Sequence, residues 1–238
     1  MEIEYLLFCL LGFLASIVSA VFAFGTALIV LAVGSHILPV KEAIVFGTVL
    51  FAASTIFKTL LFGKHFDWKV AGIMAVASLP FAYLGASLLS YVPDGVIRRI
   101  LGIMILLYLV LTIFKLFPKI RIGTIGLVGG SVAYGFVSGL LGSGNLIKVI
   151  MFREMNITKE AFVGAMAATS VLANIAKLTA YIQSGLLSAN HAWPIAGLVV
   201  AAILAVLLGR IFLRSISVPQ FQIGVQVVLA VSAIGLIL

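Results

Sequence analysis

Three lysines, Lys58, Lys148 and Lys177, lie inside long apolar stretches of the chain. A charged side chain at such a place is costly unless it serves a ligand or reaches the surface with its ammonium group. All seven carboxylates, in contrast, fall in the polar segments between the stretches or at the N-terminus. Buried positive charge without buried acid favours an anion as the ligand. For each lysine the alternative, an ammonium that reaches the membrane surface, stays open at this point.

Small and polar residues interrupt the apolar stretches 5–35 and 123–151. They are Gly25 and Thr26 in the first stretch and Gly142, Ser143, Gly144 and Asn145 in the second. If a helix begins after each break, its first N–H groups and the positive end of its dipole attract an anion. The glycines would let the backbone approach a ligand, and the hydroxyl and amide side chains supply donors. Close helix packing is the alternative reason for such small residues.

Helical spacing links the lysines to these breaks. Lys148 follows Asn145 by three residues and therefore shares its helix face. Asn174 stands one turn before Lys177, and a buried amide there needs hydrogen-bond partners. We therefore expect a substrate-binding site made of a small set of residues from both halves of the chain. They are Gly25, Thr26, Lys58, Ser143, Gly144, Asn145, Lys148, Asn174 and Lys177.

Other kinds of chemistry find little support in the sequence. The histidines are His36, His65 and His191, and they lack the spacing of metal ligands. With Cys9 as the single cysteine, we expect no metal site and no cofactor. An intramembrane serine enzyme is one alternative, with Ser138 or Ser143 as nucleophile, but no histidine lies on a buried helix face to act as its base. We therefore predict a protein that is not an enzyme.

The composition requires a membrane around these residues. Of the 238 residues, 63% are hydrophobic and 9% charged, whereas soluble proteins carry about 25% charged residues. Eight apolar stretches are long enough to read as membrane segments. They are 5–35, 43–62, 70–91, 96–117, 123–151, 161–182, 192–213 and 220–238. The net charge of +8 fits basic cytoplasmic loops beside anionic lipid, so we expect membrane lipid and no nucleic acid as a partner.

The chain also repeats itself, in the same order along both halves. The matches are Ser19–Thr26 with Ser138–Asn145 and Lys58 with Lys177 at an offset of 119, Lys41–Ala43 with Lys159–Ala161 at 118, and Val92-Pro93 with Val218-Pro219 at 126. We infer one membrane domain, residues 1–238, built from two homologous halves, 1–119 and 120–238. A binding site between such halves is expected near the bilayer midplane.

Two topologies are compatible with the repeat. If stretches 5–35 and 123–151 are single tilted helices, there are eight crossings, and the basic loop residues divide 5 against 7 between the two sides. If both are re-entrant hairpins of two half-helices, each half has three full crossings, and the halves are inverted. The basic residues then divide 9 against 3, with only Lys41, Arg98 and Arg99 outside. Because basic residues concentrate in cytoplasmic loops, the hairpin arrangement is favoured, with both termini outside.

At these motifs the chain resembles the TauE/SafE sulfite exporter family, also called toluene sulfonate uptake permeases. The resemblance covers nearly the whole chain, with a glycine-rich motif opening each half, and Gly63–Trp68 resembles the family's Gly-x-x-Asp-Trp loop. The family's Gly-x-Gly-Gly-Gly run is reduced here to Gly25 in the first half and to Gly142 and Gly144 in the second. The resemblance implies movement of sulfite, sulfonates or related organosulfur anions.

We therefore expect an all-α, polytopic membrane protein with two inverted repeats, each a re-entrant helical hairpin plus three transmembrane helices. Its predicted function is transport of a small sulfite- or sulfonate-class anion across a prokaryotic inner membrane. A non-transporting membrane assembly factor is the alternative. The sequence leaves open the anion, the direction of transport, the driving ion and whether the chain forms a homo-oligomer.

Overall fold

The structure, a computed structural model, describes residues 2–22, 26–62, 67–116, 123–153 and 159–212, and six positions between 226 and 237. The described ranges are helical and contain no strand, so the predicted all-α class is confirmed. The helices are α1 (Glu2–Phe22), α2 (Thr26–Ile37), α3 (Val40–Phe62), α4 (Trp68–Leu89), α5 (Asp94–Ile113), α6 (Thr124–Leu141), α7 (Asn145–Arg153), α8 (Lys159–Gln183) and α9 (Ala192–Phe212), with the 3-10 turn Ala189–His191 before α9.

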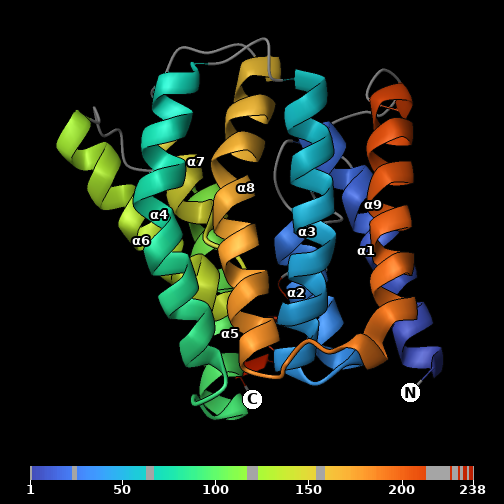
Figure 1. Cartoon of the computed structure of the whole chain (residues 1–238). Coiled ribbons are helices and arrows are strands. Elements are labelled where there is room, and N and C mark those ends of the chain that lie inside the picture. Colours follow the sequence, from blue (N-terminus) through green and yellow to red (C-terminus); the bar gives the residue numbers. More distant parts are fainter. Residues whose placement is uncertain are drawn as a thin grey trace.

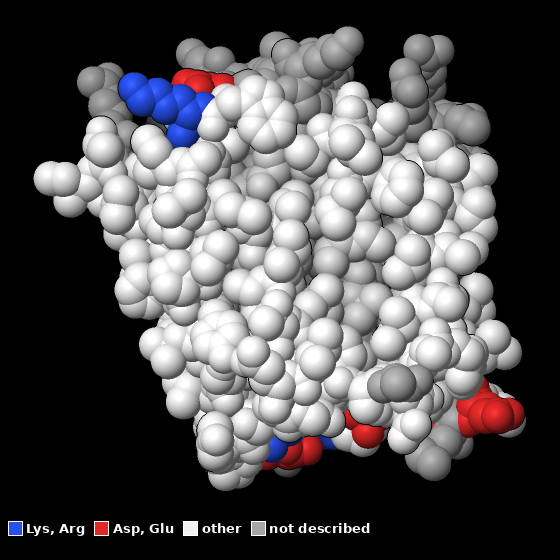
Figure 2. Space-filling model, in the orientation of Figure 1, with Lys and Arg blue, Asp and Glu red and all other residues white. Residues whose placement is uncertain are grey.

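Six of the described helices are long and apolar enough to cross a membrane. They are α3, α4, α5, α6, α8 and α9. Figure 2 shows acidic and basic side chains gathered at the two ends of the visible face, with none across its middle. An uncharged belt between two charged ends is the surface that a bilayer requires. The chain is a multi-pass membrane protein, as the composition predicts.

The polar segments predicted from the sequence mark where helices start and stop. The Asp67 carboxylate accepts a hydrogen bond of 2.7 Å from the Lys69 N–H and caps the start of α4. Pro93 occupies the cap position of α5, with Asp94 in the first turn. Gly142 ends α6 in a left-handed conformation, with φ at +79°, which glycine adopts without the steric penalty of a Cβ atom.

The helices alternate in direction, and the halves are interleaved (Figure 1). Chain colour shows α3 and α9 running upward and α4 and α8 running downward. Across the halves, α4 packs on α6 and α8, while α9 packs on α1 and α3, and α3 packs on α8. Under the predicted repeat, α4 would correspond to α9, α1 to α6 and α3 to α8, and exchanging the two halves maps these contacts onto each other.

Helix boundaries repeat along the chain as well. The α2 helix begins at Thr26 and α7 at Asn145, and α3 begins at Val40 and α8 at Lys159. Both pairs are 119 residues apart, the offset found in the sequence. In each long stretch the break separates a long first helix from a short second helix, which we call the two arms. The first arms, α1 and α6, have 21 and 18 residues, and the second arms, α2 and α7, have 12 and 9. The arms are therefore unequal, and the break lies late in each stretch instead of at its middle.

The α4 and α6 helices touch backbone to backbone. A Cβ atom added at Gly85, Gly135 or Gly139 would lie 2.3 Å from a carbonyl oxygen of the opposite helix. Small residues at such crossings let two membrane helices approach closely, because lipid offers no hydrophobic drive for their association. This crossing fixes α6 and, with it, the tip at residues 142–144.

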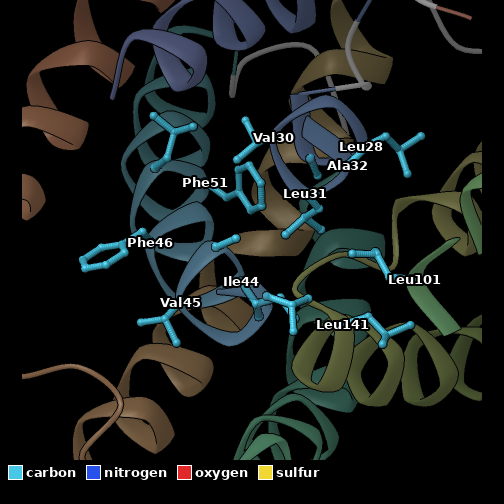
Figure 3. Packing of buried hydrophobic residues seen from close by; sticks show 14 of the residues in the cluster. Leu28, Val30, Leu31, Ala32, Ile44, Val45, Phe46, Phe51, Leu101 and Leu141 are labelled. Carbon is cyan, nitrogen blue, oxygen red and sulfur yellow. The ribbon is translucent and has the colours of Figure 1, made fainter. Parts of the chain in front are cut away.

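Most of the short helix α2 is buried in the protein, while His36 in its last turn is exposed. Its residues Val30, Leu31 and Ala32 have no exposed surface. Figure 3 shows Leu31 near Ile44 of α3 and Leu141 of α6, and a Cβ atom added at Gly142 would lie 3.3 Å from Leu31 and 3.2 Å from Ile44. A helix too short to span a bilayer is tolerated in a membrane protein where it is buried in protein.

Candidate functional site

The structure contains a central pocket of about 60 Å³. Helices α2, α3, α6, α7 and α8 and the tip between α6 and α7 contribute to its wall. The residues that line it are Thr26, Ala27, Phe51, Ser54, Thr55, Lys58, Tyr134, Ser138, Gly142, Ser143, Asn145, Val163, Met166, Ala167, Ser170, Asn174 and Lys177. Six of the nine residues predicted for the site are therefore brought together here, from positions far apart in the sequence.

Lys177 joins α8 to the tip of the second stretch. Its side chain is 1% exposed, and its Nζ donates to the Gly142 carbonyl at 3.0 Å and to the Ser138 hydroxyl at 3.2 Å. Ser138 is not among the residues that we predicted for the substrate-binding site. Both partners are neutral, so neither of them offsets the positive charge of a protonated Lys177 at the pocket wall.

Lys58 is the counterpart of Lys177 in the first half. It is 7% exposed and also lines the pocket. Five carboxylates have side chains that the structure describes: Glu2, Glu4, Glu42, Asp67 and Asp94. They stand at helix starts, and none of them lines the pocket. The pocket therefore presents two cationic side chains, one from each half, and no described acid.

A hydrogen bond joins the two halves directly at this pocket. The Asn174 amide donates to the Thr55 hydroxyl at 3.1 Å. These residues are 119 positions apart, which is the offset of the predicted repeat, under which they would be equivalent. The buried amide predicted to need partners finds one in the other half of the chain.

Two short helices begin at the pocket. Thr26 is the first residue of α2 and Asn145 that of α7, and both line the wall. The Asn145 N–H donates to the Ser143 hydroxyl at 3.4 Å. The N–H groups at the start of a helix lack partners within it, and they make such an end attractive to anions.

Lys148 lies behind the pocket and is not among the lining residues. It is fully buried, so its ammonium does not reach the surface. Its Nζ donates to the Met166 carbonyl at 2.7 Å, to the Thr169 hydroxyl at 3.3 Å and to the Ser170 hydroxyl. It also stands 4.5 Å from the centre of the Tyr134 ring, a cation–π geometry.

The remaining predicted residues are both glycines. Gly144 packs against α6, where an added Cβ would lie 2.8 Å from the Tyr134 carbonyl oxygen, and it is outside the lining set. Gly25 lies outside the residues that the structure describes. Tyr134 is a pocket residue that sequence reasoning missed, since nothing distinguishes it from the aromatic residues common in membrane helices.

Gly142 provides a test of how the tip holds the site. We expect Gly142→Ala to lose about 1–2 kcal/mol of stability from the left-handed conformation and to impair the site as well, because its carbonyl accepts from Lys177. Gly185→Ala is the matched control: its φ is +74° and an added Cβ meets no atom within 4 Å. Thermal unfolding should show a loss for both variants, the larger one for Gly142→Ala, whose Cβ would lie 3.2 Å from Ile44 and 3.3 Å from Leu31. Only Gly142→Ala should weaken anion-dependent stabilisation. Equal anion responses would contradict this role of the tip.

Comparisons with known proteins give one match. The model of the family described as "Sulfite exporter TauE/SafE" matches residues 8–236. No curated protein and no solved structure matches the chain.

Proposed function

Since this chain belongs to the sulfite exporter TauE/SafE family, we propose that it carries a small anion of the sulfite or sulfonate class across a prokaryotic inner membrane. The observation that carries the proposal is the central pocket. It presents Lys58 and Lys177, several hydroxyl and amide groups and two helix N-termini, with no described carboxylate. This combination favours anions over cations, because the two lysines and the two helix N-termini all present positive charge to the pocket.

The interleaved halves support transport in preference to static binding. We interpret the exchange symmetry of the helix contacts and the opposite directions of α3 and α8 as an inverted repeat (Figure 1). We interpret α1–α2 and α6–α7 as re-entrant hairpins, with both chain termini on the outer side. In inverted-repeat carriers the site lies at the interface near the midplane, and one unit rocks against the other around it. The Asn174–Thr55 contact supports a pocket beside the axis of such a repeat, because two equivalent residues of inverted halves touch only at that axis.

The pocket is small, with a volume of about 60 Å³. We therefore expect the smallest sulfur oxyanions, such as sulfite, sulfate and thiosulfate, to be carried in preference to large aromatic sulfonates.

Anion flux in proteoliposomes tests the function. Purified protein should give saturable uptake of one member of the series sulfite, sulfate, thiosulfate and methanesulfonate, measured with and without an imposed voltage. Protein-free liposomes provide the baseline. Folded protein that moves none of these anions would contradict the proposal.

Substitutions at the first residues of α2 and α7 distinguish an anion carrier from a membrane assembly factor. We expect Thr26→Val and Asn145→Leu each to reduce anion flux about tenfold or more, the loss typical of 1.4 kcal/mol or more of binding free energy. Each change removes a polar group from the pocket wall at similar volume. Gly72→Ala, where an added Cβ meets no atom within 4 Å, is the control. Full flux in both pocket variants would favour a role without transport.

A further inference from the structure

Lys148 is a buried cation that does not line the pocket, although its neighbours do. Its Nζ is bonded to Met166 and Ser170 and faces the ring of Tyr134, and all three of these residues line the cavity. The ammonium is therefore separated from the pocket by the residues that line it. At the equivalent position of the first half, 119 residues earlier, stands the apolar Ile29. The lysine thus breaks the symmetry of the site.

The surroundings of Lys148 contain no compensating negative charge in the described part of the chain. From α8 the neighbouring groups are Lys177, which repels it, and the hydroxyls of Thr169 and Ser170. From α6 it meets Tyr134, and α4 contributes apolar residues such as Met74 to the cluster beside α7. The side chains of Arg153, Lys159 and Glu160, at the ends of α7 and α8, are outside the described set.

Lys148 and Lys177 are both buried, and their described hydrogen-bond partners are all neutral. A buried charge without a counter-charge is costly, and an anion in the pocket supplies negative charge. Lys177 lines the pocket and can contact that anion, whereas Lys148 lies behind the wall, so an ammonium at Lys148 depends on the anion's charge without a direct contact to it.

The hydrogen bonds around Lys148 are compatible with both protonation states. As an ammonium it donates to one carbonyl and two hydroxyls. As a neutral amine it has a lone pair, and the Ser170 hydroxyl, which now donates to the Met166 carbonyl at 2.9 Å, can rotate and donate to that lone pair. The Tyr134 hydroxyl donates to Ser170 at 3.1 Å and links this group to the pocket wall.

We propose that Lys148 is a proton-binding residue whose protonation is coupled to anion binding in the pocket. When the anion enters, the Nζ lone pair forms a bond with a proton taken from water; when the anion leaves, that bond breaks and the proton returns to water. No electrons are exchanged with a second reactant. By linkage, protonation of Lys148 strengthens anion binding by the same factor as the anion favours protonation. This inference rests on the proposed function.

Proton uptake on anion binding tests the coupling. The probe is thiosulfate, whose own protonation does not change near neutral pH. A pH-sensitive dye in weakly buffered detergent solution reports proton uptake, and thermal stabilisation of the same sample reports binding. For the wild type we expect uptake of up to one proton per bound anion. Lys148→Met and the permanently charged Lys148→Arg should bind thiosulfate with at least about tenfold less uptake.

The possible outcomes distinguish the proposed coupling from the proposed anion transport. Wild-type protein that binds thiosulfate without taking up protons would overturn the coupling and leave the anion site intact. Undiminished uptake in either variant would overturn the assignment to Lys148. If sulfite, sulfate and thiosulfate neither stabilise the wild type nor cross proteoliposomes with it, the proposed function fails and the coupling fails with it. The wild-type measurement decides the coupling even if both variants misfold.

Discussion

Lys177→Met should lower anion flux in proteoliposomes by at least about thirtyfold, the smaller end of the loss expected when one partner of a buried charge contact is removed. Lys177 supplies one of the two lysine charges at the pocket wall, and its Nζ also holds the Gly142 carbonyl at 3.0 Å. The change removes both the charge and the link from α8 to the tip. Methionine keeps the length and flexibility of the side chain, so the packing around it changes little.

The variant should remain folded without substrate, because it removes a buried cation that lacks a described carboxylate partner. Thermal unfolding separates the two effects: stability without anion stays near the wild-type value, and stabilisation by saturating anion is lost. Ser138→Ala is the control. It removes one hydrogen-bond partner of Lys177 at 3.2 Å but keeps the charge, and we expect it to retain more than a tenth of wild-type flux. Wild-type flux in Lys177→Met would show that the pocket is not the anion site.

Much of the fold could be predicted from the sequence because membrane helices are long and apolar and their ends are polar. The stretches 43–62, 70–91 and 96–117 agree with α3, α4 and α5 to within a few residues. The breaks at Thr26 and Asn145 were also found, since small polar residues inside an apolar run are unusual. The unequal lengths of the arms were not predicted, because apolar composition alone does not show where in a long stretch the chain turns.

The candidate site was predictable only where polar residues stand out against an apolar background. Lys58, Asn174 and Lys177 stand out in this way, and the structure places all three at the pocket. The separation of Lys148 from the pocket depends on how α7 packs against α8, and helical spacing from Asn145 could not show that. Tyr134 depends on the same packing, because only the position of α6 brings its hydroxyl to Ser170.

The close approach of α4 and α6 carries the largest predicted effect on folding. At Gly139 an added Cβ would lie 2.3 Å from the Ala82 carbonyl oxygen and 2.7 Å from the Ala86 nitrogen. Both are backbone atoms, so no side chain can move aside and the helices themselves must separate. We expect Gly139→Ala to lose at least about 3 kcal/mol of stability, which lowers the melting temperature by roughly 10 °C for a chain of this size.

Gly129→Ala, on the same helix, is the control that separates the effect of disturbing the α4–α6 contact from the effect of replacing glycine by alanine. An added Cβ there meets no atom within 4 Å, and alanine favours a helix over glycine by about 1 kcal/mol. The melting temperature of Gly129→Ala in detergent should therefore equal or exceed that of the wild type, while that of Gly139→Ala falls. Because α6 ends at Gly142 and α7 begins at Asn145, a displaced α6 also displaces the tip, so flux should fall with the melting temperature. A Gly139→Ala protein as stable as Gly129→Ala would show that α4 and α6 are not in backbone contact.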